Sequence, residues 1–258
     1  MLKNKMLLGG CVLLIIAALV YVTYTNKPEQ TATFVVGTVA GYAPFVSINQ
    51  QGEYEGFDVD MARAVAATMG KQLVLKDLGS MPSLFTALQQ GSIDAIIWGV
   101  SITEERLQKV AMIHYQGEIT SSYPLIFWES IPAGVQSIAD MHGKVVCVEP
   151  ASSQEAVLCQ CDGIVQLSTE RVDDALLNIR YGKADAAFVE PAIAKKFKAK
   201  FPELQILDVP LATKDCVQGV GIVISKDKSA LIQDVTDAVS VLKKDGTVAR
   251  LEQQWGIE

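Results

Sequence analysis

Hydrophobic positions in the first part of the chain alternate between two spacings, which predicts strands interleaved with helices. Short apolar runs with the length of buried strands occur at residues 34–38, 72–76 and 95–98. Apolar residues recur at helical spacing over 58–70 and 80–90, and each segment ends at or next to a glycine. We predict a helix in each, with Asp58 as the N-cap of the first.

The same alternation starts again after about residue 121. Strands are predicted at 145–148, 164–167, 186–189, 205–209 and 219–225. Helices are predicted at 137–141, 153–159, 172–181, 191–200, 228–245 and 247–255. Strands and helices that alternate through short glycine turns predict an α/β fold with mostly parallel sheets.

One short motif occurs twice. Residues 91–95 and 182–186 both read G-x-x-D-A, each after a predicted helix and before an apolar strand. The repeat is either a coincidence between two ordinary helix–turn–strand units or the mark of two lobes with matching substructures. Ligands of open parallel sheets bind beyond the carboxyl ends of the strands. Two lobes that face each other through those ends would place Ser101 and Glu190 across one cleft.

We expect residues 1–30 to lie outside the folded part. Lys3 and Lys5 precede an apolar run over 6–24, and about 17–25 apolar residues span a bilayer as a helix. This pattern indicates an export signal, or a membrane anchor that is retained, followed by a polar tether. Lipidation of Cys11, which follows Leu-Gly-Gly, is the alternative. In each case the rest of the chain is exported, to the periplasm in our prediction.

Composition and charge exclude several classes of function. Half of the 258 residues are hydrophobic, which supplies a core and excludes wholesale disorder. The net charge is −7 and no run of Lys and Arg occurs, which argues against nucleic-acid binding. His114 and His142 are far apart in the sequence and have no cluster of Cys or His nearby, so we expect no metal site.

Four cysteines follow the N-terminal segment, namely Cys147, Cys159, Cys161 and Cys216. An exported protein can form disulfides, and four cysteines allow three pairings. A bridge between Cys159 and Cys161 is disfavoured by their tight spacing. Two bridges, one bridge or none remain open.

Two charged residues near the predicted strand ends could bind a zwitterion. Arg106 can hold a carboxylate through two parallel hydrogen bonds, and Glu190 can pair with an ammonium group. The alternatives are a solvated helix arginine and a carboxylate that the dipole of the next helix stabilises. Tyr42 could be a loop aromatic or a pocket wall, and Trp98 could be a core residue or a face that stacks on a cation.

Ser153 and Gln154 begin a predicted helix. Their side chains either cap this helix or form hydrogen bonds with a ligand. The sequence has no nucleophile elbow, no P-loop and no Ser/His/Asp grouping at matching strand ends. We therefore assign no catalytic residues, expect no cofactor and predict that the protein is not an enzyme.

Several motifs follow one another in a characteristic order. They are Gly37-Thr38, Tyr42-Ala43-Pro44-Phe45, Gly56-Phe57-Asp58-Val59-Asp60, Asp94-Ala95-Ile96-Ile97, Ser101-Ile102-Thr103-Glu104-Glu105-Arg106, Gly143-Lys144, Ser152-Ser153-Gln154-Glu155, Asp185-Ala186-Ala187 and Lys244-Asp245-Gly246-Thr247. This series resembles family 3 of the bacterial extracellular solute-binding proteins, the polar amino-acid receptors of ABC importers. The resemblance covers nearly everything after residue 33.

The resemblance implies two lobes joined by two crossing strands. Lobe 1 would comprise residues 33–119 and 217–258, and lobe 2 residues 124–211. The hinges would lie near 120–123 and 212–216. The ligand would bind between the lobes of a monomer and be delivered to an ABC permease in the inner membrane.

The resemblance also implies roles for single residues. Arg106 would hold the α-carboxylate of the ligand, helped by Ser101 and by the amide of Ser153. Glu190 would hold the α-ammonium group, where the family usually has Asp, together with the carbonyl of Gly99. The ring of the tyrosine at position 42 would pack over the ligand.

The pocket for the ligand side chain departs from the family pattern. Val39 stands where receptors for basic amino acids often have Asp, and Met81 replaces a usual aromatic. Trp98 replaces a small residue, and the turn at 149–151 carries an acid in place of a more neutral sequence. We interpret these changes as a rebuilt pocket.

Arginine is the ligand that we predict. A buried cation needs an acid, and the acids near the predicted cleft are Glu53, Glu149 and Glu190. Trp98 offers a flat face to a guanidinium group. Glutamine or another polar amino acid is the alternative, since Val39 removes one expected acid. A dehydratase-like enzyme on the same fold is the alternative of another class.

Overall fold

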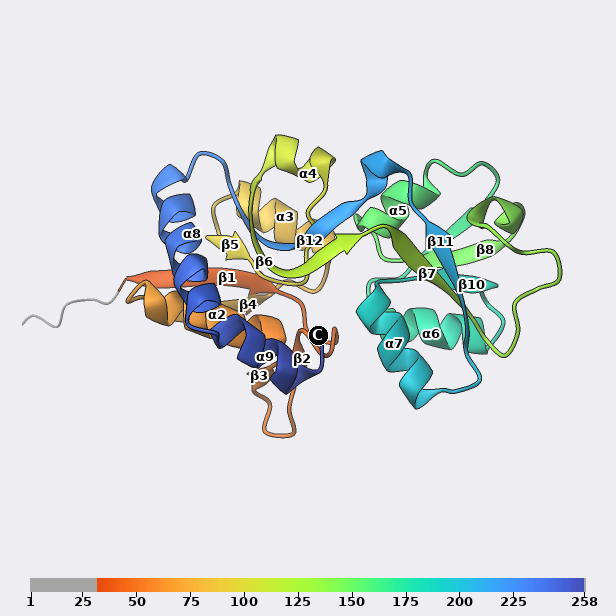
Figure 1. Cartoon of the computed structure of the whole chain (residues 1–258), viewed down its shortest axis with the longest axis horizontal. Helices are drawn as coiled ribbons and strands as arrows, with labels where there is room; N and C mark the ends of the chain where they lie inside the picture. The colour runs from red at the N-terminus through yellow and green to blue at the C-terminus, as the bar shows by residue number, and fades with distance from the viewer. Residues whose placement is uncertain (1–31, 258) are drawn as a thin grey trace, which may run out of the picture. The chain divides into compact units, whose positions relative to one another are not determined.

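The computed structural model describes residues 32–257, which form a mixed α/β structure with two five-stranded sheets (Figure 1). The α/β fold class with two lobes is confirmed. The N-terminal signal or anchor and the lipidation of Cys11 lie outside the described residues. Within the described part, no helix is long and apolar enough to cross a membrane.

The first sheet, with its helices, forms lobe 1. Its strand order is β4 (Gln72–Asp77), β1 (Thr33–Thr38), β5 (Ala95–Ile96), β12 (Val217–Ile224) and β6 (Ala111–Thr120). The helices of this lobe are α2 (Phe57–Thr68), α3 (Met81–Gln89), α4 (Glu104–Lys109), α8 (Ser229–Lys244) and α9 (Thr247–Trp255). A small hairpin of β2 (Ser47–Ile48) and β3 (Tyr54–Glu55) precedes α2.

The second sheet forms lobe 2 in the same way. Its strand order is β11 (Gln205–Pro210), β7 (Ser122–Phe127), β10 (Ala186–Phe188), β8 (Val145–Val148) and β9 (Val165–Ser168). The helices are η1 (Ile138–Met141), α5 (Ser153–Leu158), α6 (Val172–Arg180) and α7 (Pro191–Lys200), and the short helix η2 (Thr213–Asp215) lies on the return from β11 to β12. Figure 1 shows α6 and α7 next to each other beside this sheet.

The sheets are mixed, which corrects the prediction of mostly parallel strands. β1 pairs in parallel with β4 and β5, and β8 pairs in parallel with β9 and β10. The long strands β6, β7, β11 and β12 add antiparallel pairs to each sheet. The antiparallel strands are the ones that carry the chain from one sheet to the other.

The chain passes between the two sheets twice. It leaves the first sheet at the end of β6, at Thr120, and enters the second at Ser122, where β7 begins. It returns after Pro210 and re-enters the first sheet at Val217. A bridge between Ser101 and Val220 ties the loop after β5 to the returning strand β12, so this loop is held at the crossing.

The two copies of the G-x-x-D-A motif have the same structural role. The Asp94 carboxylate accepts a hydrogen bond from the amide of Val35 at 2.9 Å, and Asp185 accepts one from Val145 at 2.8 Å. Asp94 therefore fixes β5 beside β1 in lobe 1, and Asp185 fixes β10 beside β8 in lobe 2. This favours matching substructures over coincidence, and it fixes the chain where β5 and β10 begin.

Helix α2 begins two residues earlier than its predicted cap implies. Gly56 is the N-cap, with φ 131°, and a Cβ there would lie 2.1 Å from the carbonyl oxygen of Phe45. Asp58 lies in the first turn, buried, and accepts a hydrogen bond of 2.6 Å from the hydroxyl of Tyr115. The prediction of Asp58 as the N-cap was wrong, because the turn needs a glycine and the aspartate has a buried partner.

The four cysteines in the described residues are free thiols. Cys147 is buried in β8, and Cys159 is exposed at the end of α5. Cys161 and Cys216 are half-buried. The sequence left two bridges, one bridge or none open. Among these four cysteines the structure has no bridge.

Candidate functional site

The predicted strand ends of the two lobes meet. Ser101, in the loop after β5, donates a hydrogen bond from its hydroxyl to Glu190 Oε1 at 2.9 Å. Glu190 follows β10 directly and precedes Pro191, which begins α7. The two residues are 89 positions apart in the sequence, and their contact joins lobe 1 to lobe 2.

Arg106 reaches both lobes from helix α4. Its Nη1 donates to the carbonyl oxygen of Ser101 at 2.7 Å, and its Nη2 donates to the carbonyl oxygen of Ala151 at 2.8 Å. Thr103 caps α4 through its hydroxyl and so fixes the backbone that carries the arginine. Burial lowers the pKa of the Arg106 guanidinium, while the charges of Tyr123, Glu190 and Glu149 oppose this effect.

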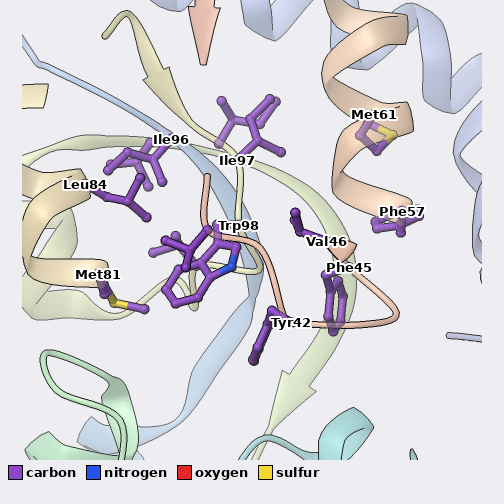
Figure 2. Packing of buried hydrophobic residues seen from close by; sticks show 14 of the residues in the cluster. Tyr42, Phe45, Val46, Phe57, Met61, Met81, Leu84, Ile96, Ile97 and Trp98 are labelled. Atoms are coloured by element: carbon purple, nitrogen blue, oxygen red, sulfur yellow. The ribbon is translucent and has the colours of Figure 1, made fainter. Parts of the chain in front are cut away.

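Aromatic side chains form the lobe 1 wall of the site. The rings of Tyr42 and Trp98 lie 5.2 Å apart, and Tyr42 also stacks on Phe45 at 5.4 Å. Figure 2 shows these rings with Met81 at the edge of the same cluster. Met81 Sδ lies 3.4 Å from Arg106 Nη2. The thioether therefore contacts the guanidinium group of Arg106.

Helix α5 begins at the lobe 2 side of the site. Ser152 caps it by accepting a hydrogen bond from the amide of Glu155 at 3.0 Å. The Ser153 hydroxyl lies 2.7 Å from the hydroxyl of Tyr123 and 3.4 Å from that of Ser101. The next residue, Gln154, is buried and lines a cavity together with Ser153 and Ser101.

Two carboxyl groups share this environment. Burial, followed by the negative charge of Glu190, raises the pKa of Glu149 to about 8, and Arg106 partly offsets the rise. Burial also raises the pKa of Glu190, while the nearby amide of Gln154, the hydrogen bond from Ser101 and the charge of Arg106 counteract it. Both carboxyls therefore hold protons more tightly than exposed glutamates do.

Two adjoining small cavities, of about 10 and 20 Å³, lie between these residues. Both are lined by Tyr42, Glu149, Gln154 and Glu190. The first is also lined by Met81, Trp98, Gly99, Ser101, Arg106, Ser152 and Ser153, and the second by Cys147, Val148, Thr169, Val172, Ala175, Phe188 and Val189. We call the pair the ligand cavity.

Three polar atoms in the wall of the ligand cavity are buried without a hydrogen-bond partner. They are Trp98 Nε1, Glu149 Oε1 and Gln154 Nε2. An unpaired buried polar group is costly in free energy, so each has a donor or acceptor to offer to a bound molecule. Gln154 nevertheless lies close enough to Glu190 to lower the pKa of that carboxyl.

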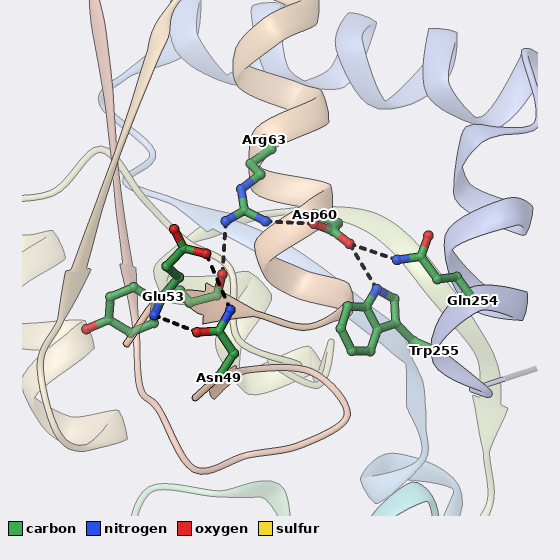
Figure 3. Close-up of polar contacts among 7 residues, drawn as sticks. Asn49, Glu53, Asp60, Arg63, Gln254 and Trp255 are labelled. Atoms are coloured by element: carbon green, nitrogen blue, oxygen red, sulfur yellow. Dashed lines mark hydrogen bonds and ion pairs between the residues drawn. The ribbon is translucent and has the colours of Figure 1, made fainter. Parts of the chain in front are cut away.

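One predicted site residue lies elsewhere. Glu53 is exposed in the turn between β2 and β3, where its amide donates to Asn49 Oδ1 at 2.9 Å (Figure 3). It does not line the ligand cavity. The expectation that Glu53 lies near the cleft was wrong, because the hairpin turns this part of the chain away from the strand ends. The ten other predicted residues line the cavity.

A larger cavity, of about 610 Å³, adjoins the ligand cavity on the side of the crossing strands. It shares Tyr42, Gly99, Ser101 and Glu190 with the ligand cavity. Its other walls come from residues 43–45, β6, β12, α7, the end of α9 and the residues after it. Thus Glu190 can be reached from this side as well as through the ligand cavity.

Sequence reasoning missed two tyrosines that support the site. Tyr123 is buried at the start of β7 and orients the Ser153 hydroxyl. Tyr115, in β6, bonds to Asp58, whose carboxylate lies near Gly99. Both belong to crossing strands for which the sequence predicts no element, and no regular pattern of apolar residues marks them out. Within residues 32–257, no group of three or more His, Cys, Asp or Glu side chains could hold a metal ion.

Comparison with known proteins agrees with this geometry. Residues 34–258 match the model of the bacterial extracellular solute-binding proteins, family 3. A probable ABC transporter arginine-binding protein of Chlamydia trachomatis serovar D, ArtJ, is 34% identical over 229 residues. The aligned region covers 89% of this chain and 88% of that protein.

Solved structures have the same fold. An ancestral arginine-binding protein bound to arginine has a TM-score of 0.78 at 26% identity, over 88% of this chain and 99% of that chain. One bound to glutamine has a TM-score of 0.78 at 27% identity, over 89% and 100% of the two chains. The ancestral amino acid-binding protein AncCDT-1, a precursor of cyclohexadienyl dehydratase, has a TM-score of 0.74 at 25% identity, over 87% and 95%. With its family match over residues 34–258, this chain belongs to the bacterial extracellular solute-binding proteins of family 3.

Proposed function

We propose that this protein is the substrate-binding component of an ABC importer and captures a free amino acid with a cationic side chain, arginine first. The ligand would bind in the cavity between the lobes, and the hinges would be residues 120–123 and 212–216. The name of the ArtJ relative supports arginine as the first candidate.

The charge balance of the ligand cavity carries this proposal. Its charged lining residues are one cation, Arg106, and two acids, Glu149 and Glu190. An α-carboxylate would pair with Arg106 and an α-ammonium group with Glu190. This leaves Glu149 Oε1, buried without a partner, for a positive charge on the ligand side chain. A ligand of net charge +1 therefore neutralises the cavity.

Other groups in the cavity suit the same ligand. The carbonyl of Gly99 and the hydroxyl of Ser101 line the cavity near Glu190, where a ligand ammonium would bind. The rings of Tyr42 and Trp98 offer flat surfaces to a guanidinium group. The protein would act outside the inner membrane, as a monomer, and deliver the ligand to a permease.

Calorimetric titration with the twenty amino acids and with citrulline tests the proposal. Citrulline has nearly the shape of arginine but a neutral side chain. We expect the tightest binding for arginine and at least tenfold weaker binding for citrulline, since an unpaired Glu149 would remain. Binding of none of these compounds would refute the proposed function.

Glutamine or another polar amino acid is the second ligand class. It is supported by the raised pKa of Glu149, because a protonated carboxyl group can donate a hydrogen bond to an amide oxygen. In that case glutamine and citrulline would bind as tightly as arginine at neutral pH. The same titration therefore separates the two classes.

A dehydratase-like activity is the candidate of another class. Two buried carboxyls with raised pKa values in one cavity could act as acid and base, and AncCDT-1 is described as a precursor of such an enzyme. Incubation with a cyclohexadienyl amino-acid precursor and detection of the aromatic product tests it. Turnover that Glu190→Gln abolishes would support this candidate over a pure receptor.

A further inference from the structure

We propose that Arg171 is a latch residue, which holds the two lobes together at the rim of the ligand cavity and slows release of the ligand. This inference rests on the proposed function for its main readout. Arg171 does not line the cavity, and it would act through closure of the cleft rather than through contact with the ligand.

The contact lies between lobe 2 and lobe 1. Arg171 is the N-cap of α6 in lobe 2, and Gly41 lies in the loop after β1 in lobe 1. A Cβ built on Gly41 would lie 3.3 Å from Arg171 Nη2, 3.5 Å from Cζ and 3.8 Å from Nε. Three guanidinium atoms at similar distances mean that the flat face of this exposed side chain lies over the space beside Gly41 that a Cβ would occupy.

The local backbone on both sides favours this contact. The carbonyl of Arg171 accepts hydrogen bonds from the amides of Asp174 and Ala175, which fixes the start of α6. Gly41 has φ 92°, a conformation that side chains with a Cβ rarely adopt. The glycine thus permits both the turn and the approach of the guanidinium group.

The neighbours of both residues line the ligand cavity. Tyr42 follows Gly41, and Val172 follows Arg171; both line the cavity, as does Thr169. The contact therefore spans the gap between the two walls at this end. The small cavity of about 20 Å³ at this end has no lining residue from β6 or β12, so the latch acts on the side away from the crossing strands. A contact far from a hinge resists opening more effectively than one beside it.

Stopped-flow measurement of arginine release tests the latch. The variants are Arg171→Ala, Arg171→Lys, which keeps the charge but loses the flat group, and Arg180→Ala as the matched control. Arg180 lies on the same helix and stacks over Trp128 at 5.2 Å, so it does not contact Gly41 through that group. Full-length exported protein is used throughout.

We expect release to become about tenfold faster in both Arg171 variants, because the closed state is less populated. The preference for arginine over citrulline and the melting temperature should stay unchanged. Arg180→Ala should release arginine at the rate of the unmodified protein. Release that is unchanged in Arg171→Ala, or faster in Arg171→Ala but not in Arg171→Lys, would overturn the latch, since the second result indicates a charge effect alone.

A double-mutant cycle gives a second, independent measure. Gly41→Ala should also speed release, because its methyl group displaces the guanidinium. In the Arg171→Ala background the same glycine change should have a smaller effect. Equal effects in both backgrounds would contradict a direct latch.

Failure of the proposed function can be told apart from failure of the latch. If the unmodified protein binds none of the amino acids, the proposed function fails while the latch is judged from small-angle scattering without ligand. The latch then predicts a larger radius of gyration for Arg171→Ala than for Arg180→Ala. Equal radii would overturn it.

Discussion

The hydroxyl of Ser101 donates to Glu190 Oε1 at 2.9 Å, and this bond joins the ends of strands from two different sheets. Arg106 bridges the same gap through the carbonyls of Ser101 and Ala151. A zwitterion that binds here would meet a carboxylate and a guanidinium group that are already positioned by backbone contacts. Little rearrangement of either charged group is then needed on binding.

Glu190→Gln should abolish measurable capture of amino acids. The change keeps the shape of the side chain but removes the charge that would pair with the ligand ammonium group. Loss of one partner of a buried charge pair costs about 2–5 kcal/mol, or roughly 30- to 5000-fold in Kd. Calorimetry with arginine measures the loss. Glu203→Gln, at an exposed position of lobe 2, is the control and should bind as the unmodified protein does. Equal affinity in the two variants would contradict a role for Glu190 in binding.

Glu149→Gln should change the choice of ligand more than the strength of binding as such. Without the carboxylate, the distal cation of arginine has no partner, and we expect its affinity to fall by about 2 kcal/mol or more. Citrulline should lose less affinity or gain some, because an amide can pair with a neutral urea group. Titration of both ligands into both proteins gives the ratio that decides the question. A ratio that stays the same would show that Glu149 does not face the ligand side chain.

The sequence predicts the helices, the parallel strands and the returning strands β11 and β12 well, but not the outgoing strands β6 and β7. Helix α7 runs over Pro191–Lys200, as its proline start and apolar spacing indicate. No element was predicted for 111–127, because β6 is mostly half-buried along its length and β7 contains a proline. Strands of this kind lack the clean alternation or continuous apolar run on which sequence reasoning depends.

The site was predictable where topology decides it and not where packing decides it. Ser101 and Glu190 follow parallel strands, so the rule for strand ends places both at the cleft. The contact of Tyr123 with Ser153 depends on β7 and could not be read from the sequence. Glu53 was misplaced because nothing in its neighbourhood shows in which direction a short hairpin turns.

Asp60→Ala should loosen helix α9 from helix α2. Asp60 Oδ2 accepts hydrogen bonds from Trp255 Nε1 at 3.0 Å and Gln254 Nε2 at 3.3 Å (Figure 3). Its other oxygen binds Arg63 at 2.9 Å. Removal leaves the half-buried indole donor unpaired, which we expect to cost about 1–3 kcal/mol of unfolding free energy.

Urea denaturation measures this cost. Asp237→Ala is the control, since the carboxylate of Asp237 accepts from Gln233 on the exposed face of α8. Arg63→Ala should cost less than Asp60→Ala, about 0.2–1 kcal/mol, because its ion pair is more exposed. An Asp60→Ala variant as stable as Asp237→Ala would mean that the network does not hold α9.

Without ligand, the protein should lose stability as the pH rises from about 4.5 to about 8. The pKa of Glu149 is raised from 4.5 to about 8 and that of Asp58 from 3.8 to about 7, in both cases mainly by burial. Between these limits the folded chain holds protons that the unfolded chain has released. The slope of unfolding free energy with pH is therefore negative, and the stability is fully present only below the unfolded pKa values.

Melting temperatures at pH 5, 6, 7 and 8 would show this fall, and Glu149→Gln separates the contribution of one group. The amide cannot titrate, so the variant should lose less stability than the unmodified protein over this range and should be the more stable of the two at pH 8. Groups with lowered pKa, such as Asp140, act in the opposite sense but at lower pH, because their carboxylates titrate below the usual range. A melting temperature that rises between pH 5 and pH 8, or falls equally in both proteins, would mean that Glu149 is not buried as a protonated acid.

Arginine at saturating concentration should raise the melting temperature more at pH 8 than at pH 6, since the bound cation favours the ionised carboxylate.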